Sequence, residues 1–313
     1  MLPGAALIQF AFAVVLPTSA VFGQVNGRDH SDRVRDRGAD ELLLAGKQWD
    51  LLGEGYHLTA DSTVDKAGNV YFTDEPRNRI LRIDPGGHIT TWKEDTNNAH
   101  GLALGPDGLM YVGQHERKRI VTLSGDEPES VITEGVQSHH LTVTARSHVY
   151  FTVPPTHKVW LIDATGRRRV VHDGLKWPRA VRASPDESAL VVSDSAAGVV
   201  WSFRIRADGS LFNQRPFCRL EADGKTSEAD AGGMAFDSEG FLYVATNTGV
   251  QVCSPQGRVT AVIDTPGEVA SAVFFGGTGQ QWLYVTDGSR IWRRPARRRG
   301  TALWSVKATQ TRR

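Results

Sequence analysis

A phrase made of a polar turn followed by a short apolar run occurs six times along this chain, and the spacing of the copies constrains the fold. The central residues of the apolar runs lie 40, 39, 41, 52 and 41 residues apart, at Tyr71, Tyr111, Tyr150, Val191, Tyr243 and Tyr284. A period near 40 built from strands is typical of propeller blades. The sequence therefore predicts an all-β fold, a six-bladed β-propeller.

A second apolar run follows each anchor and supports the same fold. In four copies it opens nine residues after the anchor, as at Ile80 and Val159, and in the last two copies it opens after seven. Turns such as Asp107-Gly108 separate the runs, and these residues accept the positive φ of tight hairpins. The repeats predict one propeller domain over residues 48–304, closed by an early strand near 49–52 that pairs into the last blade.

The two ends of the chain differ in composition from the repeats. An apolar stretch at 5–16 is followed by small residues, which is typical of a signal peptide over 1–23 and predicts a periplasmic or secreted protein. Charged residues dominate 24–47, which we interpret as a polar linker. A basic tail is expected over 305–313. The apolar stretch is shorter than a membrane span, so no span is expected in the mature chain.

Net charge and cysteine usage exclude some functions and leave others open. A net charge of +1 gives no field that would recruit nucleic acid, so the expected partner is a small molecule. The two cysteines, Cys218 and Cys253, fall in different blades. Export permits a disulfide between them, but their spacing does not require one, and we expect unpaired thiols. Common motifs of hydrolases, redox proteins and phosphate-binding proteins are absent from the sequence.

The repeat also locates the residues that should line one mouth of the central channel. In a propeller the loop that enters each innermost strand presents side chains at this mouth, where a ligand can be held. Counting back from the anchors gives one residue per blade. The predicted ring is Ala60, His100, His139, Arg179, Gly232 and Ala272.

Several strand phrases together closely resemble the gluconolactonase and senescence-marker-protein (regucalcin-like) family. They are WDLLGEGY at 49–56, VYFTD at 70–74, YFT at 150–152, VW at 159–160, GVQVC at 249–253 and LYVTD at 283–287. The resemblance covers about residues 48–304. It implies a six-bladed propeller that holds a divalent metal in the channel and hydrolyses sugar lactones.

The resemblance also implies which positions should bind the metal and substrate, and this chain departs from the family there. The glutamate of blade one is replaced by Ala60, and the asparagine of blade two by His100. His139-His140 stands where blade three has asparagine and aspartate. Blades four and five carry Arg179 and Gly232 in place of asparagine and aspartate. Calcium and magnesium need oxygen ligands, so we expect the calcium-type site to be lost and predict no cofactor.

Several interpretations of the altered site remain open. Asp61 and Asp230 lie beside expected ligand positions and could restore a site, although strand alternation should point Asp61 away from the channel. His100 and His139, with His140 or His57, could hold zinc or a similar transition metal.

Two metal-free interpretations are also open. One is a hydrolase of lactones or related sugar derivatives, with His139 or His140 as general base and Arg179 as oxyanion or anion-binding group. The other is a non-catalytic propeller that binds a small anionic ligand or a protein. In either interpretation, the Trp177 side chain could line one side of a sugar-sized ligand, although we expect it to pack in the core. His115 is expected to lie in a surface turn.

Overall fold

The computed structural model describes residues 38–57, 59–125, 127–222, 230–267 and 269–301. Every described residue belongs to one compact unit of the chain. The expected signal peptide and basic tail lie outside the described residues. None of the helices in the described ranges has the length and apolarity needed to span a membrane.

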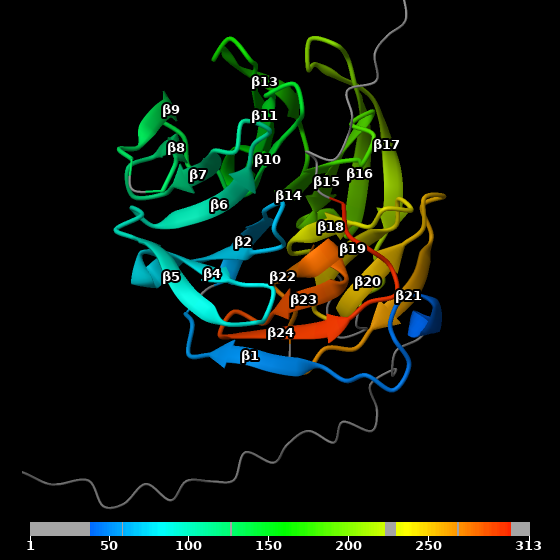
Figure 1. Ribbon diagram of the computed structural model, residues 1–313. Coiled ribbons are helices and arrows are strands. Elements are labelled where there is room, and N and C mark those ends of the chain that lie inside the picture. The colour runs from blue at the N-terminus through cyan, green and yellow to red at the C-terminus, as the bar shows by residue number, and fades with distance from the viewer. Residues whose placement is uncertain (1–37, 58, 126, 223–229, 268, 302–313) are drawn as a thin grey trace, which may run out of the picture. The chain divides into compact units, whose positions relative to one another are not determined.

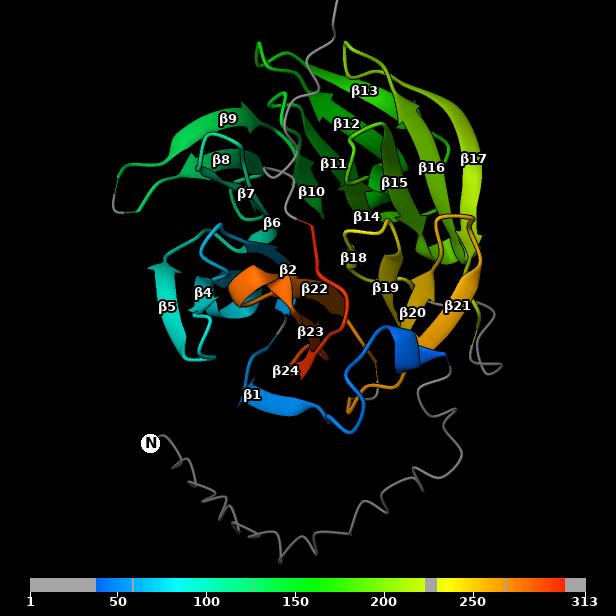
Figure 2. The same ribbon diagram turned by 45° about the vertical axis from the view of Figure 1, so that its right-hand side comes forward.

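Six four-stranded antiparallel sheets form the blades of a propeller, which confirms the predicted fold class (Figures 1 and 2). Blade 1 contains β2 (Thr59–Val64), β3 (Val70–Asp74), β4 (Arg79–Ile83) and β5 (Ile89–Glu94). Blade 2 contains β6 (Ala99–Leu104), β7 (Met110–Gln114), β8 (Arg119–Leu123) and β9 (Ser130–Glu134). Blade 3 contains β10 (Leu141–Val143), β11 (Val149–Val153), β12 (Lys158–Ile162) and β13 (Arg168–Asp173).

The remaining three blades repeat this arrangement. Blade 4 contains β14 (Pro178–Ala183), β15 (Ala189–Asp194), β16 (Val199–Ile205) and β17 (Leu211–Arg219). Blade 5 contains β18 (Met234–Phe236), β19 (Leu242–Thr246), β20 (Gly249–Cys253) and β21 (Val259–Ile263). Blade 6 contains β22 (Ala272–Gly276), β23 (Trp282–Thr286), β24 (Arg290–Pro295) and β1 (Asp50–Glu54). Short 3-10 turns are η2 (Ala39–Glu41), η3 (Glu75–Arg77), η4 (Pro154–Thr156), η5 (Ser195–Ala197) and η6 (Thr278–Gln280).

Blade 6 is completed by the strand nearest the N-terminus, as the sequence predicts. β1 pairs antiparallel with β24, with Leu51 opposite Trp292 (Figure 1). Because the first strand and the last three share one sheet, the ring of blades is closed by hydrogen bonds. Part of the expected linker also packs on the propeller: Ala39, Leu42 and Leu43 are buried in the cluster between blades 5 and 6.

The hydrophobic core lies between neighbouring blades, where the apolar runs of the repeat meet. One cluster joins Tyr71 and Ile80 of blade 1 to Leu102 and Val112 of blade 2. Similar clusters join the other neighbouring blades. These strands are apolar on both faces because each blade is covered on two sides, which explains why the runs are continuous rather than alternating.

The two cysteines are joined, so the expectation of unpaired thiols was wrong. Cys218 of β17 and Cys253 of β20 form a disulfide, with Cα atoms 6.5 Å apart. Both side chains are buried in the cluster shared by blades 4 and 5. Sequence spacing could not show this contact, because it arises from packing of the outer strand of blade 4 against the next blade.

Candidate functional site

Each inner strand begins with a β-bulge, and the bulges shape the mouth of the channel. In blades 1, 2 and 4 the pairing register shifts by one residue, between Thr59 and Ser62 in β2 and at the matching places in β6 and β14. In blades 3, 5 and 6 the N–H groups of His139, Gly232 and Ser271 donate to carbonyls of the facing strand ahead of the regular ladder. Two consecutive residues of each inner strand therefore face one partner residue.

The bulges define two rings of equivalent positions around the channel. A third ring lies two residues after the second ring along the same strands. The first ring is Ala60, His100, His139, Arg179, Gly232 and Ser271. The second ring is Asp61, Gly101, His140, Ala180, Gly233 and Ala272. The third ring is Thr63, Ala103, Thr142, Arg182, Ala235 and Phe274. The prediction of Ala272 for the first ring was wrong by one residue: Ala272 pairs directly with Thr286, which places Ser271 at the bulge.

Hydroxyl groups opposite the bulges satisfy the backbone that the bulges leave unpaired. The Thr152 hydroxyl accepts from the N–H of His140 (3.3 Å) and donates to the carbonyl of Arg179 in the next blade (2.7 Å). Thr73 makes the same connection between the N–H of Asp61 and the carbonyl of His100. The first and second rings are thus held in place by contacts between blades as well as within them.

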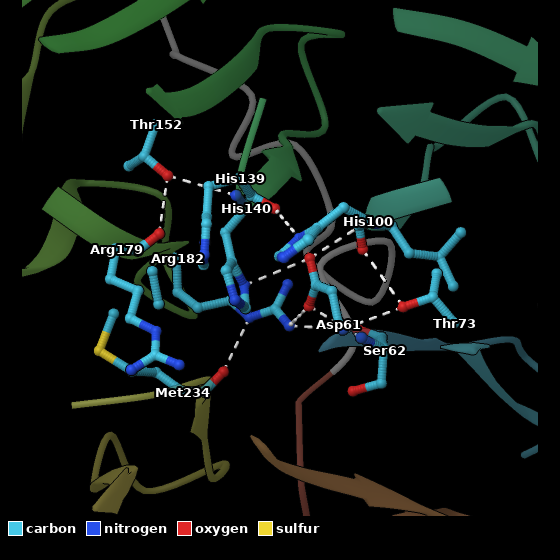
Figure 3. A network of polar contacts seen from close by, with 12 residues as sticks. Asp61, Ser62, Thr73, His100, His139, His140, Thr152, Arg179, Arg182 and Met234 are labelled. Atoms are coloured by element: carbon cyan, nitrogen blue, oxygen red, sulfur yellow. Dashed lines mark hydrogen bonds and ion pairs between the residues drawn. The ribbon is translucent and has the colours of Figure 1, made fainter. Parts of the chain in front are cut away.

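Asp61 lies at the centre of the polar network in the channel (Figure 3). Its carboxylate accepts from the backbone N–H groups of Ser62 (2.8 Å) and Leu102 (3.1 Å). It also contacts His140 Nδ1 (3.3 Å) and Arg182 Nη2 (3.4 Å). Burial alone would raise the pKa of Asp61, but the charges and hydrogen bonds of His140 and Arg182 hold it below its ordinary value.

The expectation that Asp61 points away from the channel was therefore wrong. Strand alternation holds only along a regular ladder, and the register shift between Thr59 and Ser62 breaks it. The Asp61 side chain consequently joins the polar network in the channel, where it is 2% exposed.

Arg182 crosses the channel from blade 4 and contacts two other blades (Figure 3). Its Nε donates to the carbonyl of Met234 in blade 5 (2.8 Å), and Nη2 donates to the carbonyl of Ser62 in blade 1 (3.2 Å) in addition to Asp61. A charged side chain in an inner strand is costly unless it is paired. The ion pair with Asp61 and the two carbonyls supply that pairing.

Four histidines from blades 2 and 3 are packed against one another at the mouth. The rings of His100 and His139 lie 4.2 Å apart, those of His100 and His115 lie 4.5 Å apart, and those of His139 and His140 lie 5.1 Å apart. We call these four residues the histidine cluster. Its crowding favours neutral rings, because neighbouring imidazolium charges repel one another.

Protonation differs strongly within the histidine cluster. His115 donates from Nδ1 to Glu75 (2.9 Å) and from Nε2 to the carbonyl of Ser138 (2.9 Å). Burial alone would lower the pKa of His115, but the Glu75 and Ser138 bonds raise it above its ordinary value. Burial, together with the charge of His115, lowers the pKa of His100 to about 4. Its Nδ1 therefore carries the proton donated to the carbonyl of His139 (2.7 Å).

His139 is neutral and only partly enclosed. Burial, followed by the charges of His100, His140 and Arg179, lowers its pKa well below the ordinary value. Its Nδ1 is buried and has no hydrogen-bond partner among the described residues. Since the ring as a whole is not fully buried, Nε2 is the nitrogen that can face a bound molecule.

Arg179 and Asp230 form an ion pair on the other side of the mouth. Arg179 Nη1 donates to Asp230 (2.7 Å), and both side chains reach solvent. Trp177 lies two residues before Arg179, and its side chain is 41% exposed rather than packed in the core. Its backbone N–H donates to Asp194 (2.8 Å), which fixes the loop that carries it.

The donor set does not favour a metal ion. In the ranges that the structure describes, no group of three or more His, Cys, Asp and Glu side chains could hold one. His100 Nδ1 is hydrogen-bonded to the carbonyl of His139, and the Asp61 carboxylate is already occupied by Arg182 and His140. His57 is exposed, and no described contact joins it to the histidine cluster.

The sequence predicted part of this site and missed the rest. The structure brings the rings of His100, His139 and His140 together and pairs Arg179 with Asp230 at the start of the inner strands. The expectation that His115 lies free in a surface turn was wrong, because Glu75 draws it into the histidine cluster. Arg182 and Glu75 were missed. The signal for Arg182 was a charge within the otherwise apolar inner-strand phrase 178–183, and Glu75 gave no signal beyond its place directly after a strand.

Known proteins resemble this chain over most of its length. A family model for the SMP-30/gluconolactonase/LRE-like region matches residues 63–289. A gluconolactonase of Zymomonas mobilis is 24% identical in an alignment of 268 residues, and the match covers 72% of this chain and 75% of that protein. Among solved structures, a gluconolactonase from Xanthomonas campestris has a TM-score of 0.74 at 22% identity, over 85% of this chain and 96% of that one. A calcium-binding regucalcin from Agrobacterium tumefaciens has a TM-score of 0.70 at 14% identity, over 82% of this chain and 95% of that one. This chain belongs to the SMP-30/gluconolactonase/LRE-like family.

Proposed function

We propose that this protein is an exported hydrolase of small lactones or related sugar derivatives that works without a divalent cation. Family membership and the gluconolactonase relatives support the substrate class. The observation that carries the metal-free chemistry is His139, a neutral and partly exposed imidazole at the channel mouth with a guanidinium nearby.

The calcium-type cation of the family does not fit the residues of the first ring. A divalent cation of this kind takes six to eight oxygen ligands, several of them carboxylates. Here the ring offers two imidazoles and the guanidinium of Arg179, which would repel a cation. Asp61 is the nearest buried carboxylate, and Arg182 already occupies it.

The remaining groups can perform the hydrolysis themselves. His139 Nε2 takes a proton from water as the water oxygen bonds to the lactone carbonyl carbon, and the N–H groups of Arg179 that Asp230 does not use stabilise the oxyanion. The ring C–O bond then breaks, and the proton on His139 passes to the leaving alkoxide, which yields a hydroxy acid. The Asp61–His140 pair lies behind His139, and its carboxylate stabilises positive charge that develops in the two stacked rings.

A direct test is hydrolysis of glucono-1,5-lactone by protein kept in chelator, compared among variants. His139→Ala should lower kcat/KM by about 100-fold or more, the usual contribution of a general base. His88→Ala is the matched control and should keep wild-type activity. The His88 side chain is exposed in the hairpin turn between β4 and β5. Equal activity of His139→Ala and wild type would refute the assignment of the base.

A second function is favoured by the Arg179–Asp230 pair and the exposed Trp177. An ion pair that reaches solvent, with an exposed indole two residues away in the chain, can hold a hydroxy acid without reacting with it. If purified protein shows no turnover but binds gluconate in calorimetry, and Arg179→Met abolishes that binding, the protein is a receptor for small hydroxy acids. Trp177→Ala should weaken the same binding.

A further inference from the structure

The channel contains a second cavity beyond the Asp61–Arg182 pair, at the third ring. It has a volume of about 80 Å³, and all six third-ring residues line it. None of the histidine cluster does. Since the third ring lies two residues further along the inner strands than Asp61 and its equivalents, the cavity is separate from the mouth where we place hydrolysis.

Several hydrogen-bond donors in this cavity have no acceptor. Thr142 is fully buried, and its hydroxyl has no partner among the described residues. Arg182 uses Nε and Nη2, while its Nη1 makes no hydrogen bond to another described residue. The Thr63 hydroxyl accepts from the N–H of Leu104 (3.0 Å), and its own proton has no described acceptor. Gln280 Oε1 is a buried acceptor in the lining that has no hydrogen-bond partner among the described residues.

A cavity in which donors outnumber acceptors favours a ligand rich in acceptors. The Arg182 guanidinium can serve two acceptors at once, so its contact with Asp61 through Nη2 leaves Nη1 for another. Ala103, Ala235 and Phe274 form apolar parts of the wall, and a charge interaction beside apolar atoms is screened less than one in bulk water. The volume admits a few small atoms and no sugar ring.

We propose that the third-ring cavity binds a small monovalent anion, held by Arg182 Nη1 and the hydroxyls of Thr142 and Thr63. Formate represents the class, because its two oxygens match a guanidinium and a hydroxyl. The proposal does not rest on the proposed hydrolysis: His139 and Arg179 do not line the cavity, although Arg182 also pairs with Asp61 behind the mouth. It accounts for the buried Thr142 hydroxyl, which otherwise has no role in the described structure.

The test is a titration of sodium formate, followed by the proton resonance of formate and by calorimetry, at ionic strength held constant with sodium sulfate. For a ligand of three non-hydrogen atoms, binding no tighter than about 0.5 mM is expected. Thr142→Val should weaken it about 3- to 10-fold, the effect of one hydrogen bond, and Arg182→Met should abolish it. Thr91→Val and Arg204→Met change exposed strand residues and should bind formate like the wild type.

Three results would overturn the proposal. The first is the absence of saturable formate binding to the wild-type protein. The second is equal binding by wild type and Thr142→Val, a variant that keeps the fold because valine has nearly the same shape as threonine. The third is loss of binding in His139→Ala, which should bind formate normally; that loss would place the ion at the mouth instead.

Discussion

Protonation at the channel mouth is set by the neighbours of each histidine rather than by the residue type. His100 and His115 stack on one another, yet the pKa of one lies well below its ordinary value and that of the other lies above it. The difference is Glu75, which contacts His115 at 2.9 Å and His100 only at 3.9 Å. The Glu75 carboxylate thus raises the pKa of His115 above its ordinary value, although the ring of His115 is stacked on that of His100.

Replacing Glu75 should reverse the titration of His115. In Glu75→Gln the carboxylate is lost, so burial should dominate and the pKa of His115 should fall below its ordinary value. The ion pair stabilises the fold while His115 is charged, so its contribution is present below the unfolded pKa and is lost as pH rises through the folded pKa. A histidine NMR titration measures the shift.

The matched control for this variant is Glu94→Gln, an exposed carboxylate at the end of β5. It should leave the His115 titration unchanged. A His115 pKa that stays raised in Glu75→Gln would show that the Ser138 carbonyl, rather than Glu75, keeps the ring charged.

At the scale of elements, the bulge at the start of each inner strand decides which side chains enter the channel. It turns two consecutive residues toward the axis region, and an opposing hydroxyl in β3, β11 and β15 satisfies the extra backbone N–H. Each repeat of about 40 residues therefore places its two ring residues in a similar position at the start of the inner strand. Each blade can change its two ring residues without changing the scaffold.

Removing one of these hydroxyls should destabilise the fold. Thr152→Val leaves the N–H of His140 and the carbonyl of Arg179 without a partner in a buried region, at a cost of about 1–3 kcal/mol in the free energy of unfolding. Urea unfolding measures this cost. The exposed Thr91→Val should stay within about 0.5 kcal/mol of wild type, and an equally small effect for Thr152→Val would contradict the role given to the hydroxyl.

The disulfide between blades 4 and 5 should also contribute to stability. It closes a loop with a sequence separation of 35 residues, for which about 2–4 kcal/mol is expected. Cys218→Ala/Cys253→Ala should lower the free energy of unfolding by that amount. Reducing agent should lower the free energy of unfolding of the wild-type protein to that of the double variant, and should leave the double variant unchanged. A wild-type free energy of unfolding that does not respond to reducing agent would mean that the bond is not formed.

At the scale of the whole molecule, the architecture was predictable and the site only in part. The period and apolar runs predict six blades, and the strand at 49–52 predicts the closure, because both depend on patterns along the chain. Asp61 and Ser271 were misplaced because a bulge shifts strand register by one residue, which alternation cannot show. Arg182, His115 and the disulfide depend on contacts between distant blades, which no local pattern encodes.

The chain has the propeller scaffold of its family, and a guanidinium lies on the axis of its channel. Blades 1, 4 and 5 are tied across the channel by Arg182, a fixed cation that is part of the chain. We therefore expect the geometry of the site to be independent of divalent ions in solution.

The most direct measurement of this claim is kcat/KM for glucono-1,5-lactone before chelation, after exhaustive dialysis against EDTA, and after return of calcium, magnesium, manganese or zinc. We predict the same value, within about twofold, in every state, because His139 and Arg179 supply the chemistry. Activity that disappears in EDTA and returns with one of these metals would contradict the account.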